Sequence, residues 1–142
     1  MTQTLKEASF SEARSQLSRL FDEVIEDLRP VLIRRKGREE ALLLRRDNLE
    51  VLLEPFTLTV QVMPEDDGSV TIAVDELEWA INAPTREAAV EELLEDLRQY
   101  AGDYLARAPV FLRAPNRRTH FPYVLRILLA STDEQIRRML NV

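Results

Sequence analysis

A group of cationic side chains in the first third of the chain has the residue types and spacing to bind an anion. Its members, with a serine that precedes one of them in a helical pattern, are Ser11, Arg14, Arg34, Arg35, Lys36 and Arg38. A guanidinium donates two parallel hydrogen bonds to a phosphate or to the edge of a guanine, and the free N–H groups of a helix start also bind phosphate. We therefore expect these six residues to form a DNA-binding surface.

A purely structural interpretation of the same residues is also open. Ser11, or Ser9 before it, would then only cap the following helix, and Arg14 would pair with a neighbouring acid. The crowding of cations on one turn close to this helix start favours the DNA-binding interpretation.

Two elements are expected before the cationic turn. Residues 4–9 suggest a short edge strand. The segment after it has apolar residues at spacings of three and four, which is the pattern of a helix with one buried face. The residues expected on that face are Ala13, Leu17, Leu20, Phe21 and Val24.

The cations of the turn are expected on a β-hairpin over residues 30–46. Apolar residues flank the turn on both sides, and Gly37 is expected to supply the positive φ of a tight hairpin. Asp47 or Asn48 then caps a short helix that reaches Leu53. The predicted order is strand, helix, hairpin, helix.

This ordered set resembles the prevent-host-death (Phd/YefM) antitoxins of bacterial toxin–antitoxin systems over residues 5–54. The matching residues are Ser11-Glu12-Ala13-Arg14, Leu17, Val24, Pro30-Val31-Leu32-Ile33, Gly37 and Ala41-Leu42-Leu43. The resemblance implies that Arg14 and Arg35 contact operator DNA, with Arg34 replacing Arg35 if the register differs. It also implies a cognate toxin that is a ribonuclease or another translation inhibitor. A domain of about fifty residues buries too little of its own surface to be stable alone, so we expect a homodimer, whose two-fold symmetry implies a palindromic operator.

Three strands and a long helix are expected after Pro55, which cannot continue the preceding helix. Residues 56–63 and 70–74 alternate between apolar and other side chains, and residues 79–83 suggest a third strand. Thr85 is expected to cap the helix. Its buried stripe is predicted at Val90, Leu93, Leu94, Leu97, Ala101, Tyr104 and Leu105.

Residues 56–105 resemble a HicB-type antitoxin domain, a small relative of the ribonuclease H fold. The resemblance rests on the strand pattern, on the turn Pro64-Glu65-Asp66-Asp67-Gly68, on Thr85 and on the Ala/Glu-rich helix. Two glycines of that family are missing, because Leu77-Glu78-Trp79 and Asn82-Ala83-Pro84 stand in their places. We expect the fold to be kept and the loop geometry to differ.

The acids Glu65, Asp66 and Asp67 are the one cluster that suggests a metal or catalytic site. Adjacent acids before Gly68 are more typical of a hairpin turn, and a ribonuclease H site needs carboxylates from separate elements. His120 is the only histidine, and the chain has no cysteine with which it could form a nucleophilic pair. We therefore expect no catalysis, no metal and no cofactor.

The segment 106–142 matches no family as clearly. Residues 110–112 suggest a fourth strand, 113–118 a basic loop, and the residues from Pro122 onward a helix. Ser131 followed by Glu134 predicts a capping box for a last helix. We expect these basic helices to pack on the protein itself, with binding of nucleic acid or of a toxin as the alternative.

Charge is distributed unevenly along the chain, whose net charge is −6. Residues 1–54 hold 10 Lys and Arg against 11 Asp and Glu, residues 55–105 hold 2 against 12, and residues 106–142 hold 7 against 2. The acidic middle favours a basic partner protein. The absence of cysteine, of a secretory signal and of a long apolar run predicts a cytoplasmic protein with no membrane contact.

The sequence therefore predicts an α+β protein. Residues 1–54 are expected to form a Phd/YefM-like DNA-binding and dimerisation domain, 55–113 a HicB-like (partial ribonuclease H-like) sheet with one long helix, and 114–142 a helical basic tail. The predicted function is an antitoxin that neutralises a basic toxin and represses its own operon. A stand-alone transcriptional regulator or adaptor is the first alternative, and a nuclease built on the second domain is another. Phd-type antitoxins usually neutralise through an extended acidic C-terminal segment, and this chain has a basic tail there.

Overall fold

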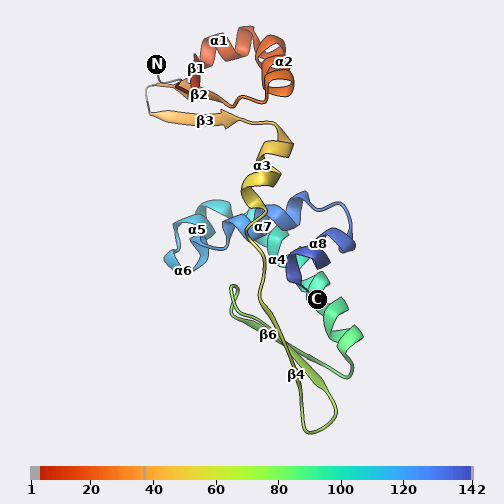
Figure 1. The fold of residues 1–142 in the computed structure, drawn as a ribbon. Helices are drawn as coiled ribbons and strands as arrows, with labels where there is room; N and C mark the ends of the chain where they lie inside the picture. Colours follow the sequence, from red (N-terminus) through yellow and green to blue (C-terminus); the bar gives the residue numbers. More distant parts are fainter. Residues whose placement is uncertain (1–3, 37, 142) are drawn as a thin grey trace. The chain divides into compact units, whose positions relative to one another are not determined.

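A computed structural model describes residues 4–36 and 38–141, and it divides the chain into two compact units, residues 1–52 and 53–142 (Figure 1). The formal charge falls entirely on the second unit, which holds 9 Lys and Arg against 15 Asp and Glu, whereas the first holds 10 of each. Among the described residues, no helix has both the length and the apolar character needed to cross a membrane.

Unit 1 is a three-stranded sheet with two helices against one face. Its elements are β1 (Lys6–Ser9), α1 (Phe10–Ser15), α2 (Leu17–Asp27), β2 (Val31–Arg35), β3 (Glu39–Leu43) and α3 (Arg46–Leu53), whose last residue falls in unit 2. The strand order is β1-β2-β3, with β1 parallel and β3 antiparallel to β2. The expected order of elements is present, except that the predicted first helix is broken in two at Gln16.

The helix ends of unit 1 differ in detail from the sequence-based predictions. Ser9 is the N-cap of α1, because its hydroxyl accepts a hydrogen bond from the backbone N–H of Glu12 at 3.1 Å. Ser11 therefore lies inside the helix and is not its cap. Helix α3 begins at Arg46, before both predicted caps, and Asn48 instead donates from its side-chain amide to the carbonyl of Leu28 at 2.8 Å.

The hairpin β2–β3 is paired symmetrically about its turn. The outermost Cα partners are Arg35 and Glu39, which leaves residues 36–38 for the connection. Lys36 has φ +52°, so a lysine occupies a left-handed conformation. The predicted role of Gly37 lies outside the described residues.

The core of unit 1 is small. It consists of Ala8, Ala13, Leu20, Val24 and Val31, with Ile33 and Leu43 packed at its edge. Leu17 and Phe21 were expected in this core, but 53% and 52% of their surfaces are exposed. The apolar face of α2 is thus wider than the surface that its own sheet covers.

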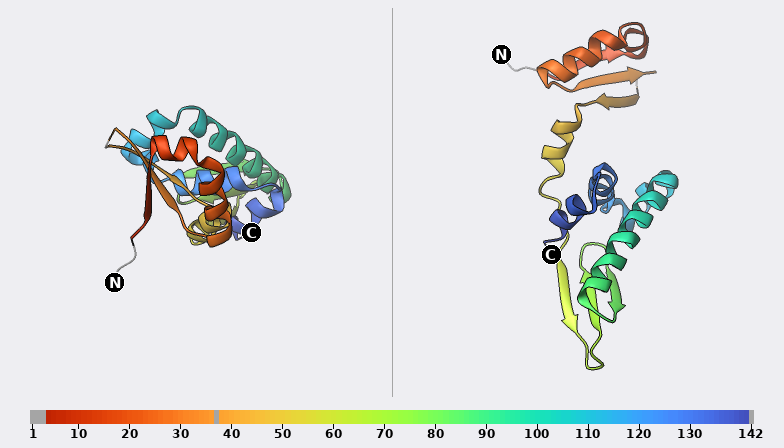
Figure 2. Two further views of the ribbon diagram at one scale, coloured as in Figure 1. Left: turned by 90° about the horizontal axis from the view of Figure 1, so that it is seen from above. Right: turned by 90° about the vertical axis from the view of Figure 1, so that its right-hand side faces the viewer.

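Unit 2 is an antiparallel sheet followed by one long and four short helices among its described residues. Its elements are β4 (Val60–Pro64), β5 (Val70–Val74), β6 (Trp79–Ala83), α4 (Arg86–Ala106), α5 (Ala108–Arg113), α6 (Pro115–Arg118), α7 (Phe121–Leu129) and α8 (Asp133–Leu140). The strand order is β4-β5-β6, and α4 lies along one face of the sheet (Figure 2). The hydroxyl of Thr85 caps α4 by accepting from the N–H of Ala88, as predicted.

The first strand of unit 2 starts later than the alternating pattern predicts. The backbone N–H of Leu58 donates to the carbonyl of Met139 at 2.7 Å, and the backbone N–H and hydroxyl of Thr59 donate to Glu76 at 2.6 and 2.7 Å. The N–H of Thr59 is the donor that a longer β4 would have paired with β5, so its bond to Glu76 ends the ladder there. Burial acts to raise the pKa of Glu76, but the hydrogen bonds from Thr59 outweigh it and hold that pKa below its usual value.

Four predictions about the later part of unit 2 are wrong. Residues 113–118 were expected as a basic loop, but residues 115–118 form the helix α6. Residues 110–112 form part of helix α5 and not a fourth strand, with Phe111 stacked on Tyr104 at a centroid distance of 4.8 Å. Leu105 points to solvent, with 58% of its surface exposed. The last helix is capped by Thr132, whose hydroxyl accepts from the N–H of Gln135, and not by Ser131.

The helices after α4 complete the core of unit 2. Val124, Ile127, Ile136, Met139 and Leu140 are buried in one cluster with the inner face of the sheet and the stripe of α4. The segment 114–142, expected as a separate helical tail, is therefore packed into the same compact unit as residues 55–113.

Candidate nucleic-acid interface

The parallel pairing of β1 with β2 brings the start of α1 to the end of β2. Ser9 is the Cα partner of Arg34, so Phe10, the first residue of α1, lies beside the last residue of β2. The guanidinium carbon of Arg35 stands 5.2 Å from the centroid of the Phe10 ring, a cation–π arrangement. Two segments that are 25 residues apart in sequence thus meet at one surface.

Arg35 is held at this surface by a second contact. Its Nε and Nη2 atoms donate to one carboxylate oxygen of Glu39, at 3.1 and 2.6 Å. Both side chains remain about half exposed, at 51% each. An exposed ion pair of this kind contributes about 0–1 kcal/mol, so a phosphate is able to compete for the guanidinium.

Arg34 points to the opposite face of the sheet, because successive residues of a strand alternate between faces. There its guanidinium lies between two acids, with Nη2 at 3.1 Å from Glu7 and Nε at 3.5 Å from Glu40. Arg34 and Arg35 are therefore neighbours in sequence that serve different surfaces. The structure places Arg35, and not Arg34, beside the start of α1.

Arg14 lies on the same side of α1 as Phe10, since residues four apart share one helix face. Arg14, Lys36 and Arg38 are exposed, and within residues 4–36 and 38–141 none of them forms an ion pair. We call Phe10, Arg14, Arg35, Lys36 and Arg38 the α1–β2 face. Ser11 is exposed on the same short helix.

Two members of this site were missed by the sequence interpretation. Phe10 was taken only as the start of the helical segment, and no sequence signal pairs it with Arg35, because their contact depends on the parallel strand pairing. Glu39 could have been found, because a hairpin symmetric about residue 37 places Arg35 opposite Glu39.

The acidic residues 65–67 of unit 2 form a hairpin turn. Gly68 has φ +89°, and Asp67 accepts hydrogen bonds from the backbone N–H and hydroxyl of Ser69 at 2.9 and 2.5 Å. These bonds lower the pKa of Asp67. Among the described residues, no group of three or more His, Cys, Asp or Glu side chains is arranged to hold a metal ion.

His120 is a buried residue that takes part in the packing of unit 2. Only 6% of its surface is exposed, and its Nδ1 lies 2.6 Å from the hydroxyl of Tyr100, which also accepts a hydrogen bond from Arg117 at 3.2 Å. Burial lowers the pKa of His120, and the cation of Arg117 lowers it further, while Glu78 acts in the opposite direction. This cluster joins α4 to the start of α7.

One solved structure shares this fold over almost the whole chain. It is described as an antitoxin part of a putative toxin/antitoxin system from Syntrophomonas wolfei subsp. wolfei; it is 27% identical, covers 96% of each chain and has a TM-score of 0.85. A search of curated proteins finds no match. The family model described as "PHD_like: Antitoxin of toxin-antitoxin, RelE / RelB, TA system" matches residues 1–142. A match over the full length places the protein in this family of toxin–antitoxin antitoxins.

Proposed function

We propose that this antitoxin neutralises a cognate toxin through unit 2 and represses its own operon by binding operator DNA through unit 1. The single observation that carries the DNA-binding half is the α1–β2 face. It joins Arg14, Arg35, Lys36 and Arg38 from a helix and a hairpin, and among the described residues three of these exposed cations have no acidic partner. Phosphate contacts by such cations supply most of the affinity of a protein for DNA.

Unit 1 acts as a homodimer in this proposal. Leu17, Phe21, Ile25 and Leu28 are exposed at spacings of three and four along α2 and its C-terminus, which gives one apolar stripe. The core beneath is too small to stabilise a domain of about fifty residues easily. A second copy that covers the stripe would give the two-fold symmetry of a palindromic operator.

Unit 2 binds the toxin in this proposal. All of the net charge of −6 lies on this unit, which favours a toxin with a basic surface by steering its approach. The helices after α4 belong to its core, so residues 114–142 support the toxin-binding surface and do not form a separate neutralising tail.

Co-expression with the protein encoded in the same operon tests the neutralising function. We expect that protein to arrest growth when expressed alone, and the arrest to be relieved when the full antitoxin chain is present. Gel shifts on the promoter upstream of the operon test the second half. If the promoter is bound and the co-encoded protein has no toxicity, the chain is instead a stand-alone transcriptional regulator.

Catalysis is not part of the proposal. The acids 65–67 are engaged in a turn, and His120 is buried against Tyr100. We expect RNA to remain intact when incubated with the purified chain and Mg²⁺ or Mn²⁺. Cleavage that is lost in the Asp66→Asn variant would favour a nuclease instead.

A further inference from the structure

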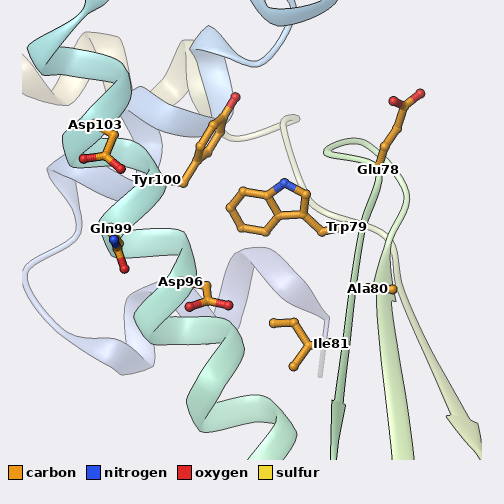
Figure 3. A pocket seen from close by; sticks show the side chains of 8 residues that line it. All are labelled: Glu78, Trp79, Ala80, Ile81, Asp96, Gln99, Tyr100 and Asp103. Atoms are coloured by element: carbon orange, nitrogen blue, oxygen red, sulfur yellow. The ribbon is translucent and has the colours of Figure 1, made fainter.

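A pocket of unit 2 lies between the strand β6 and the middle of α4 (Figure 3). Its volume is about 420 Å³. The lining residues are Glu78, Trp79, Ala80, Ile81, Asp96, Gln99, Tyr100 and Asp103. They come from two segments that the sheet and the helix bring together, and nothing in the proposed DNA-binding site uses them.

Two aromatic rings form the wall of the pocket. Trp79 and Tyr100 pack edge to face at a centroid distance of 4.8 Å and an interplanar angle of 75°. Trp79 is half-buried, and within the described residues its indole N–H has no hydrogen-bond acceptor. Aromatic faces of this kind attract a cation, especially an arginine guanidinium, which also stacks on them.

Three carboxylates line the pocket beside the rings, whereas the guanidinium of Arg117 lies over the Tyr100 ring, 5.7 Å from its centroid, and is paired with none of these acids among the described residues. Glu78, Asp96 and Asp103 all line the pocket, and no lysine or arginine does. In the part of the chain that the structure describes, none of the three carboxylates takes part in an ion pair or a hydrogen bond, whereas Asp133 on α8 is paired with Arg98 at 2.7 Å. The pocket therefore offers both an aromatic wall and uncompensated negative charge.

Strand β6 beside the pocket is the edge of its sheet. It pairs with β5 on one side, and among the described residues no strand pairs with its other side. An open edge of this kind accepts an extended segment of another chain through backbone hydrogen bonds. A second copy of this antitoxin is disfavoured as the partner, because it would bring its own Glu78, Asp96 and Asp103 toward the same three acids.

We propose that the edge of β6 and this pocket together receive an extended basic segment of the toxin, which places an arginine side chain against the indole of Trp79. Asp96 accepts hydrogen bonds from the guanidinium, and Glu78 and Asp103 add to the negative field. This inference rests on the proposed function, because it takes the toxin as the protein that binds here. It adds the surface of unit 2 that binds the toxin and the toxin side chain that this surface recognises.

Trp79 is the only tryptophan of the chain, so its fluorescence reports on this pocket alone. The probe is the peptide acetyl-Thr-Val-Arg-Val-Thr-amide, titrated into the full chain, and the control peptide replaces arginine with citrulline, which is nearly isosteric and uncharged. We expect a saturable change of emission, with binding of the citrulline peptide about ten-fold weaker. Equal binding of both peptides, or no change of emission up to about 10 mM of either, would overturn the proposal.

A variant series locates the effect. The double variant Glu78→Gln/Asp96→Asn should weaken binding of the arginine peptide about ten-fold and leave the citrulline peptide unchanged. Asp66→Asn is the matched control, because it removes one acid of the same unit at a turn that does not line the pocket. Circular dichroism should show the same fold for all variants, since none of these carboxylates forms an ion pair or a hydrogen bond among the described residues.

Binding measurements with the toxin test the pocket separately from the antitoxin function. If the wild-type chain neutralises the co-encoded protein, the double variant should bind that protein at least about ten-fold more weakly, as measured by calorimetry. Unchanged affinity would overturn the pocket and leave the antitoxin function intact. Failure of the wild-type chain to neutralise would instead remove the proposed function and, with it, the toxin as occupant.

Discussion

The two units of this antitoxin cover their apolar residues to very different degrees. Among the described residues, unit 2 buries eighteen in one cluster, whereas the core of unit 1 holds five. Nine of the fourteen large apolar side chains that are exposed among the described residues nevertheless belong to unit 1. A small unit with much exposed apolar surface is typical of a protein that is completed by association.

The difference indicates a division of tasks. In unit 2, helices of the segment α5 to α8 cover the apolar residues of α4 and of the three-stranded sheet. The surface of this unit has a pocket and, among the described residues, an unpaired edge at strand β6. Unit 1 leaves one face of α2 uncovered, and in our proposal a second copy covers it. Stability and assembly are therefore expected to respond to different substitutions in the two units.

The largest expected effect is on assembly of unit 1. The double variant Leu17→Glu/Phe21→Glu should abolish the dimer at micromolar concentration, because burying each such side chain is worth about 1.5–3 kcal/mol and the loss occurs in both subunits. Light scattering measures the change as a halving of mass. Ser18→Glu, which adds one negative charge on the same helix outside the apolar stripe, is the control. A wild-type chain that is already monomeric and folded would contradict the comparison.

The next effect concerns the stability of unit 2. Leu97→Ala should lower its free energy of unfolding by about 2–5 kcal/mol, because the side chain is fully buried and leaves a cavity. Leu105→Ala lies two turns further along the same helix with an exposed side chain, and it should change stability by less than about 0.5 kcal/mol. Denaturant unfolding distinguishes the two. Equal losses would show that α4 does not bury the stripe described above.

A smaller effect is expected for DNA binding by unit 1. Arg35→Ala should reduce operator affinity about ten-fold, whereas Arg34→Ala should change it by less than about three-fold, since Arg34 faces the other side of the sheet between Glu7 and Glu40. Arg14→Ala should weaken binding to all sequences and flatten the salt dependence by about one phosphate contact. Gel shifts at two salt concentrations test all three. A greater loss with Arg34→Ala than with Arg35→Ala would move the DNA site to the opposite face.

The smallest effect is a pH dependence of unit 2. Burial holds the pKa of His120 below its usual 6.5, so the folded state binds fewer protons than the unfolded state as the pH falls below that value. Stability is therefore full above pH 6.5 and is lost as the pH falls through the lowered pKa, by at most about 1.4 kcal/mol per pH unit. Unfolding by urea between about pH 5.5 and 7.5 measures this slope, away from the range in which Glu76 titrates. A His120→Asn variant with the same slope would assign it to another group.

Much of the architecture could be predicted from local sequence signals. The hairpin about residues 36–38, the cap at Thr85, the stripe of α4 through Tyr104 and the acidic turn before Gly68 each follow from residues close together in the chain. These features depend on backbone preferences and on side-chain periods of two or 3.6 residues, which a sequence displays directly.

Predictions from local sequence were wrong where one short apolar pattern is compatible with more than one kind of structure. The apolar run at residues 110–112 suits a strand as well as a helix, and its packing against Tyr104 decides for the helix. The pattern of α2 shows an amphipathic helix, but it does not show how much of the apolar face the same chain covers. That is why Leu17 and Phe21 were expected in the core.

The sequence alone determined which residues carry charge and which segments form helices and strands. Only the tertiary structure decided that Arg35 stacks on Phe10 while Arg34 turns away, because strand pairing sets the face of each side chain. It likewise decided that residues 78–81 and 96–103 line one open pocket. Contacts between distant segments depend on how complete elements pack, and no residue spacing within either segment encodes them.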